Sequence, residues 1–168
     1  ETFISGFPEQ RTHAVKPFAF DDQGSLFVNV GAPSNACQLE PRTKGSPGQN
    51  PCTQRKWQAA IWRFETSRAG QTQEDDGYRY SSGIRNSVAI AWNETSQAVY
   101  VVQHGRDQLD TLWPEHFDEE DNAENPAEEF LKLEDGADFM WPYCYSDAQG
   151  KKILAPEYGG DGQKIGDC

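Results

Sequence analysis

Short runs of alternating apolar and polar residues recur along the chain and predict β-strands rather than helices. Runs of this kind occupy residues 15–30, 59–65, 87–103 and 129–133. The first contains the turn sequence DDQG and the third a polar segment at Asn93, so each predicts an antiparallel hairpin. The segment 128–145 also predicts two strands, joined by a tight Asp-Gly turn. We therefore expect an all-β chain.

The strands follow a repeated order, in which a hairpin, a long loop and a further short strand come in turn. Residues 15–30 lead in this way to residues 59–65, and residues 87–103 lead to residues 129–133. Repeated sheets of three or four short strands are typical of β-propeller blades. We expect residues 1–168 to hold about two to three blades of such a propeller. A β-sandwich is the alternative that periodicity alone leaves open.

Composition and charge limit the partners of this chain. Hydrophobic residues make up 36% of it and aromatic residues 12%, so the core depends heavily on Trp, Phe and Tyr. The formal net charge of −12 argues against nucleic acid and anionic membranes as partners. No apolar run approaches the roughly 20 residues that a membrane-spanning helix needs. These numbers fit a protein that handles neutral small molecules or cations.

The four cysteines predict two disulfides that close loops. Cys37 and Cys52 flank one loop rich in Pro, Gly and Asn, and Cys144 and Cys168 flank another. Disulfides of this kind imply an oxidising compartment, so we expect a periplasmic or secreted protein. Four buried free thiols in a cytosolic protein are the alternative. The abrupt start and the end on a cysteine suggest a piece of a longer protein.

Polar and charged residues gather at the outer ends of both predicted hairpins. In an antiparallel hairpin, the residues before the first strand and after the second lie at the same end. Arg85 and Asn86 should therefore lie beside residues 104–107, and His13 beside residues 31–35. In a propeller these ends can line one rim, where loops on a rigid scaffold form ligand sites. Each also has a non-functional interpretation. His13 could be a surface histidine, Arg85 could form an ordinary ion pair and Asn86 could cap a turn. Residues 104–107 could form a solvated loop.

Four segments together resemble the glucose/sorbosone dehydrogenase family, closest to its bacterial sorbosone-dehydrogenase-like branch. They are THAVKPFAFDDQGSLFVNVG, GIRNSVAIAW, VVQHGRDQL and DGADFMWPYCY, in this order and spacing. The resemblance implies a six-bladed β-propeller that uses pyrroloquinoline quinone (PQQ) and Ca²⁺. It also implies oxidation of an aldose or sorbosone by hydride transfer to the quinone, with electrons leaving to an acceptor such as a cytochrome. The remaining blades of that propeller would lie outside these 168 residues.

The resemblance assigns a general base and cofactor contacts. His13 matches the base that takes the proton from the sugar hydroxyl, a task that suits imidazole. Arg85 and Asn86 match the pair that contacts the cofactor, and Asn35 is a further candidate contact. Thr12 departs from the pattern, because the glucose enzymes have an acidic residue immediately before the base.

The resemblance also assigns a metal site and leaves two other functions open. The backbone carbonyls of Gly105 and Arg106 match those that bind the Ca²⁺, although the family has proline in place of Arg106. A non-catalytic propeller that binds carbohydrate or protein is one alternative. A Ca²⁺-dependent lactonase-type propeller without a quinone is the other, and carboxylates converging on the metal would favour it.

Overall fold

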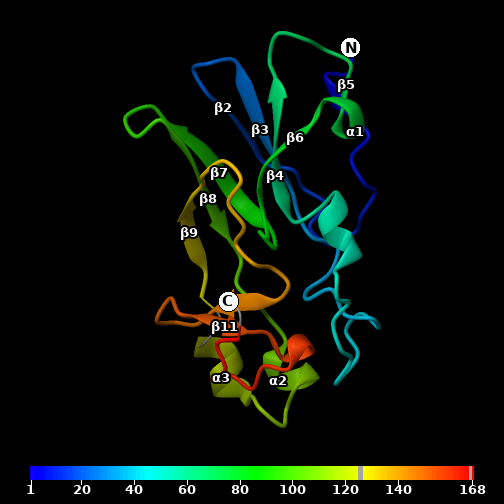
Figure 1. Cartoon of the computed structure of the whole chain (residues 1–168), viewed down its shortest axis with the longest axis vertical. Helices are drawn as coiled ribbons and strands as arrows, with labels where there is room; N and C mark the ends of the chain where they lie inside the picture. The colour runs from blue at the N-terminus through cyan, green and yellow to red at the C-terminus, as the bar shows by residue number, and fades with distance from the viewer. Residues whose placement is uncertain (125–126, 167) are drawn as a thin grey trace.

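Two antiparallel sheets dominate the computed structural model, which describes residues 1–124, 127–166 and 168. The first sheet contains, in spatial order, β2 (Phe18–Phe20), β3 (Ser25–Val30), β4 (Ala60–Glu65) and β6 (Tyr78–Ser82). The second contains β7 (Ser87–Asn93), β8 (Ala98–Gln103) and β9 (Glu129–Lys132). The sheets lie side by side at one end of the molecule (Figure 1). The expectation of a mostly β chain is confirmed, and the described residues form an open pair of sheets rather than a closed ring.

The remaining elements are short. β1 (Ile4–Ser5) pairs with β5 (Gln71–Thr72), and β10 (Cys144–Ser146) pairs with β11 (Lys152–Leu154). The helices are η1 (Thr53–Lys56), α1 (Gln73–Asp76), α2 (Leu109–Leu112), α3 (Glu119–Glu124) and η2 (Pro156–Tyr158). In the part of the chain that the structure describes, no helix has the length and apolar character needed to cross a membrane.

β3 is buried on both of its faces, which explains why it is apolar at almost every position. Leu26, Val28 and Val30 belong to one cluster, together with Trp62 of β4. Phe27 points the other way and joins a cluster with residues of the second sheet such as Val99. Successive residues of a strand point to opposite faces, so a strand buried on both sides must be apolar on both. The predicted hairpin over residues 15–30 is confirmed by the pairing of β2 with β3.

The outer face of the second sheet is apolar and open to solvent. Val102 of β8 pairs with Ala89 of β7 and with Phe130 of β9, so these three side chains share this face. Phe130 is 71% exposed although it stacks on the ring of Tyr100. Exposed apolar side chains that cluster in this way are typical of interaction surfaces.

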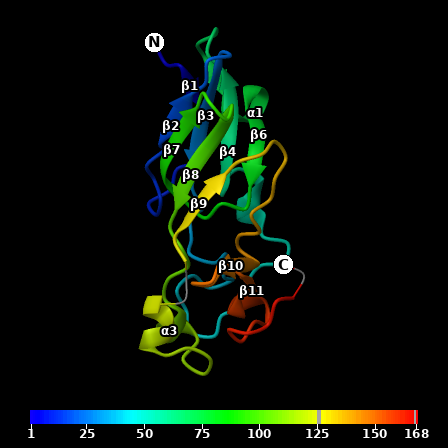
Figure 2. The same ribbon diagram turned by 90° about the vertical axis from the view of Figure 1, so that its left-hand side faces the viewer.

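The long loops and the C-terminal segment form a second, loop-rich lobe next to the sheets (Figure 2). One of its hydrophobic clusters contains Cys37, Cys52 and Trp141, and the other is built around Leu109 and Tyr145. Both predicted disulfides are confirmed as Cys37–Cys52 and Cys144–Cys168. The disulfides therefore hold the lobe in which the sheet-end loops meet.

Of the two strands predicted over residues 128–145, the first is confirmed as β9, and the expected second strand beside it is wrong. β9 pairs with β8, but the segment after the Asp-Gly turn runs along β6, where Asp138 forms a parallel bridge with Ser82. The amides of Phe139 and Trp141 donate to the carbonyls of Ser82 and Gly83 at 2.9 Å each. β6 is an edge strand with unpaired backbone groups, and these recruit the passing segment. Gly83 permits the close approach, because a Cβ there would lie 2.2 Å from the Asp138 Oδ1.

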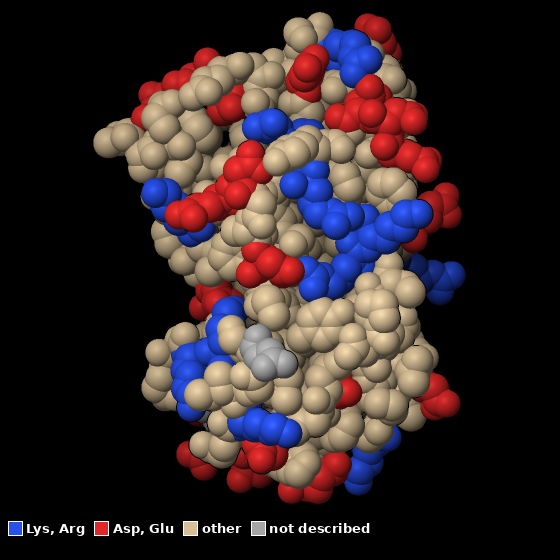
Figure 3. Space-filling model, in the orientation of Figure 1, with Lys and Arg blue, Asp and Glu red and all other residues tan. Residues whose placement is uncertain are grey.

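The charge of the chain is unevenly distributed over its surface. On the face shown in Figure 3, a group of basic side chains lies near the middle of the molecule, and acidic side chains are scattered over the whole face. Arg55, Lys56 and Arg79 lie close to one another: Arg79 donates to the Lys56 carbonyl, and burial lowers the pKa of Arg79, with a smaller contribution from the charge of Arg55. Basic side chains therefore cluster locally even though the net charge of the chain is −12.

Removal of the Cys37–Cys52 disulfide should destabilise the chain markedly. The bond closes a separation of 15 residues, and loops of about that length contribute roughly 3 kcal/mol by restricting the unfolded chain. We expect the Cys37→Ala/Cys52→Ala variant to lose about that much free energy of unfolding in chemical denaturation. The reduced wild-type chain is the matched control and should lose as much or more. A double variant as stable as the oxidised wild type would contradict this account.

Candidate functional site

The polar loops named from the sequence meet where the sheets join the loop-rich lobe. The amide of Ala32 donates to the Arg85 carbonyl at 2.7 Å, and the amide of His104 donates to the Asn86 carbonyl at 3.2 Å. These bonds tie the loop after β3 and the loop after β8 to the short link between β6 and β7. The second bond joins the two ends of the β7–β8 hairpin, as antiparallel geometry predicts, and the first brings the end of the β2–β3 hairpin beside them.

A hydrogen bond fixes the orientation of the His13 ring. Its Nδ1 lies 2.7 Å from the carbonyl oxygen of Ala32, and a carbonyl can only accept, so Nδ1 carries the proton and Nε2 keeps its lone pair. The Gln10 amide binds the carbonyls of His13 and Gly31 at 2.9 and 3.0 Å and supports this turn. The Ala32 carbonyl therefore orients the ring in a chain that has Thr12, rather than an acid, before the histidine.

The surroundings of His13 favour the neutral imidazole. Burial is the main cause and lowers its pKa from 6.5, the hydrogen bond to Ala32 opposes this, and the nearby Arg85 lowers it further. The pKa shift leaves the ring deprotonated at neutral pH, which a general base requires. His13 also has a φ of 52°, a left-handed conformation that non-glycine residues adopt at an energetic cost.

Gly31 brings His13 and Asn86 close to each other. A Cβ at Gly31 would lie 2.8 Å from the His13 Cβ and 2.5 Å from the Asn86 Oδ1, so only glycine fits between them. The fully buried Asn29 holds the Asn86 amide by donating from Nδ2 to its Oδ1 at 3.2 Å, and it accepts from the amide of Ser87 at 3.3 Å. Sequence reasoning missed Asn29. The signal was a polar residue in the otherwise apolar strand LFVNV.

The guanidinium of Arg85 is buried among three oxygen atoms, which we call the oxygen cage. Its Nε donates to the Asn35 Oδ1, its Nη1 donates to the Gly105 carbonyl, and its Nη2 pairs with the Asp107 Oδ2, all at 3.1 Å. Burial lowers the pKa of Arg85, and the Asp107 carboxylate opposes that shift. A guanidinium stays charged under such conditions, so the cage holds a positive charge.

Asn35 acts within this cage as a structural connector. Its Nδ2 donates to the Asp107 carbonyl at 2.8 Å, and its own carbonyl accepts from the Trp141 indole at 2.8 Å. The residue is only 7% exposed. These bonds place the Asn35 side chain against Arg85 and Asp107, and its direct contact with a cofactor remains a prediction.

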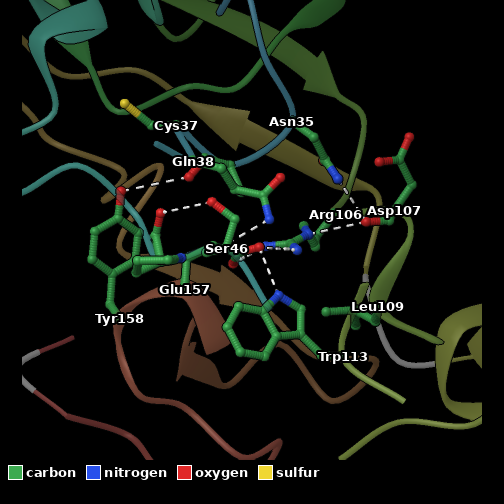
Figure 4. Close-up of polar contacts among 12 residues, drawn as sticks. Asn35, Cys37, Gln38, Ser46, Arg106, Asp107, Leu109, Trp113, Glu157 and Tyr158 are labelled. Atoms are coloured by element: carbon green, nitrogen blue, oxygen red, sulfur yellow. Dashed lines mark hydrogen bonds and ion pairs between the residues drawn. The ribbon is translucent and has the colours of Figure 1, made fainter. Parts of the chain in front are cut away.

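The Arg106 side chain anchors the loop after β8 to the loop-rich lobe. Its Nη1 and Nη2 donate to the two carboxylate oxygens of Glu157 at 2.6 and 2.7 Å (Figure 4). The Trp113 indole donates to the same carboxylate at 2.9 Å. Both side chains of the ion pair are almost inaccessible, at 4% and 0% exposure. Sequence reasoning named only the carbonyl of Arg106 and missed Glu157, which gave no local signal.

A small cavity of about 30 Å³ adjoins the oxygen cage. Four of the candidate residues line it, together with a polar chain in which Gln103 accepts from the Arg85 amide at 3.0 Å and donates to Glu129 at 2.6 Å. These four are Asn35, Arg85, Gly105 and Arg106. The volume suits about one water molecule, so a planar quinone does not fit inside this cavity. Neither His13 nor Asn86 is among its lining residues.

The donor atoms near Arg85 fit a hard cation. The cage offers a backbone carbonyl, an amide oxygen and a carboxylate, which are the oxygen types that Ca²⁺ prefers. Across residues 1–124, 127–166 and 168, no group of three or more His, Cys, Asp or Glu could hold a metal ion. Converging carboxylates, the observation that would favour the lactonase alternative, are therefore not found among the described residues.

Comparisons with known proteins agree with this architecture. A family model described as TrAA12-like matches residues 3–165. A Trichoderma reesei structure from the carbohydrate-active enzyme family AA12 aligns with a TM-score of 0.70 and 16% identity, over 100% of this chain and 42% of that one. The soluble aldose sugar dehydrogenase of Escherichia coli aligns with a TM-score of 0.53 and 19% identity, over 93% of this chain and 39% of that one. No curated protein matches the sequence.

Because the sequence identities are low, these structural likenesses establish the fold alone. A structure described as glucose dehydrogenase also aligns, with 21% identity, but its TM-score of 0.47 is too low to support an argument. This chain spans less than half the length of each of these structures. The comparisons agree with the broad resemblance to sugar dehydrogenases and do not single out the sorbosone branch.

Proposed function

Since this chain belongs to the TrAA12-like family, we propose that it is part of a sugar oxidoreductase that uses PQQ and Ca²⁺. The substrate class is an aldose or sorbosone, and the electrons pass to an acceptor such as a cytochrome. Two structures with this fold carry sugar-related names, one a carbohydrate-active enzyme and one an aldose sugar dehydrogenase. The two disulfides accord with function in the periplasm or outside the cell.

The proposal includes further blades beyond residues 1–168. Its support is the short span of this chain against the AA12 structure, at 42% of that length, and the open apolar face around Phe130. In a propeller, each sheet packs face to face against the next, as the two sheets here pack through Phe27 and Val99. A further sheet on the outer face would bury Phe130 in the same way.

His13 is the proposed general base, and its geometry is the observation that carries the proposed function. The Ala32 carbonyl holds Nδ1, which leaves Nε2 free to take the proton of a sugar hydroxyl. PQQ, when bound, would accept the hydride from the carbon that bears this hydroxyl. Burial keeps His13 neutral, so the base is ready before the sugar arrives.

Arg85 and Asn86 are the proposed cofactor contacts, with Asn35 in support. Three of the five N–H groups of Arg85 contact the oxygen cage while the guanidinium lies in it, and two remain for a further acceptor even before the guanidinium moves. Positive charge and N–H donors beside a quinone oxygen stabilise the negative charge that develops there on reduction. The carbonyls of Gly105 and Arg106 would hold the Ca²⁺.

The decisive experiment is reconstitution of the protein with PQQ and Ca²⁺, followed by dye reduction with a panel of aldoses. We expect sugar-dependent dye reduction only when both PQQ and Ca²⁺ are present. The matched controls omit one component at a time or replace Ca²⁺ with a chelator. Equal activity without PQQ, or binding of sugar with no turnover under any condition, would favour a different cofactor or a non-catalytic carbohydrate-binding propeller.

A further inference from the structure

The oxygen cage around Arg85 already holds one positive charge. The Asn35 Oδ1, the Gly105 carbonyl and the Asp107 Oδ2 each lie 3.1 Å from a different nitrogen of the guanidinium. A carboxylate, an amide oxygen and a backbone carbonyl are also Ca²⁺ ligands. The cage therefore suits two different cations, the internal guanidinium and an external divalent ion.

These two cations cannot share the cage without a large electrostatic penalty. A Ca²⁺ bound to the Gly105 carbonyl would lie next to the Nη1 that now donates to that oxygen. Like charges a few ångströms apart in a partly buried site repel strongly. Arg85 is only 7% exposed, so solvent screens this repulsion weakly.

The geometry points to Asp107 as a Ca²⁺ ligand together with Gly105 and Asn35, and to Arg85 as the internal competitor for these oxygens. This assignment deepens the proposed function and rests on it for the identity of the cation. It adds Asp107, whose carboxylate the sequence did not single out. Ca²⁺ binding would displace Arg85 from the cage and make its guanidinium available to an anionic ligand. Binding of the cation and of such a ligand should therefore be mutually favourable.

The cage is supported from outside, so it should keep its shape when Arg85 moves. The Trp141 indole holds the Asn35 carbonyl, and the Asn35 amide holds the Asp107 backbone. The buried pair of Arg106 with Glu157 anchors the adjoining loop. The Asp107 side chain is 61% exposed, so it can exchange the guanidinium for a hydrated ion without first being uncovered.

Calorimetric titration of the purified chain with Ca²⁺, without quinone or sugar, tests the competition. We expect Arg85→Met to bind Ca²⁺ at least about tenfold more tightly than wild type, because a competing charge is removed. Adding Asp107→Asn to this variant should remove most of the gain. Arg55→Met is the matched control, since Arg55 pairs with a different carboxylate, Asp138. Equal or weaker Ca²⁺ binding by Arg85→Met would overturn the proposal.

Two further variants cover the case in which Arg85→Met does not fold. Arg85→Lys keeps the charge, so its Ca²⁺ affinity should stay near that of wild type. Asp107→Asn alone changes an exposed side chain and should weaken Ca²⁺ binding to the wild-type chain. Unchanged Ca²⁺ affinity in Asp107→Asn would exclude it as a ligand.

The Ca²⁺ titration and the dye-reduction assay together separate this inference from the proposed function. Ca²⁺ binding that depends on Asp107, in a protein that reduces no dye, would overturn the proposed activity and leave the cation site standing. Dye reduction that requires Ca²⁺ but does not change in Asp107→Asn would support the proposed activity and overturn Asp107 as a Ca²⁺ ligand.

Discussion

Replacing Glu157 with leucine should lower the free energy of unfolding by about 3–5 kcal/mol. The carboxylate is fully buried and pairs with both Nη atoms of Arg106 at 2.6 and 2.7 Å. Its removal leaves a buried guanidinium without a countercharge and takes the acceptor from the Trp113 indole. A buried charge that loses its partner keeps its full desolvation penalty, which makes this the largest stability effect that we expect. Chemical denaturation of the chain measures it.

The double variant Arg106→Met/Glu157→Leu is the matched control. It removes both charges and fills the space with apolar side chains, and such replacements are often neutral or stabilising. We expect it to recover most of the stability that the single variant loses. Arg68→Ala removes the mostly exposed partner of an ion pair with Asp76 and should have a much smaller effect. A single variant no less stable than the double one would show that the buried pair does not anchor this lobe.

Replacing His13 with glutamine should lower sugar turnover by about 10²–10⁴-fold, the usual contribution of a general base. Glutamine keeps a polar side chain but cannot accept a proton at neutral pH. Measurement of kcat and of cofactor affinity in the reconstituted protein separates loss of the base from loss of binding. His116→Gln is the matched control, because that histidine is exposed in the loop-rich lobe. Wild-type turnover in His13→Gln would remove this residue from the base role.

The acid limb of the pH profile should report the lowered pKa of His13. Burial holds the ring neutral in the folded chain, so kcat/KM should rise with pH through a pKa below 6.5. The free energy of unfolding should also fall as the pH falls. The unfolded chain takes up the proton at a higher pH than the folded chain, so acidification below about pH 6.5 favours unfolding. An acid limb above that value would indicate a different titrating group.

The sequence predicted the elements that depend on neighbouring residues. The hairpin of β2 and β3 follows from alternation around a turn, and its strands pair from Phe18 with Val28 onward. The pairing of β7 with β8 places Arg85 and residues 104–107 at one end for the same reason. The Cys37–Cys52 bond spans only 15 residues, so it too was accessible from spacing.

The predictions failed where a segment pairs with a residue far away in sequence rather than with its neighbour along the chain. The residues after the Asp-Gly turn at Gly136 pair with β6 and not with β9, because the edge strand β6 has unpaired backbone groups. Glu157 was invisible for the same reason, since it lies 51 residues from Arg106. Asn29 looked like one polar position in an apolar strand until its contact with Asn86 was known.

The sequence by itself determined the β2–β3 and β7–β8 hairpins, the disulfide loops and the polar residues that end each hairpin. Those features depend on backbone conformation and residue order, which act over short distances along the chain. Only the tertiary structure decided which oxygen each buried charge faces, and so that the Arg85 guanidinium lies against Gly105 and Asp107. Buried polar groups must find partners inside the fold, and packing of residues far apart in sequence decides which partners are within reach.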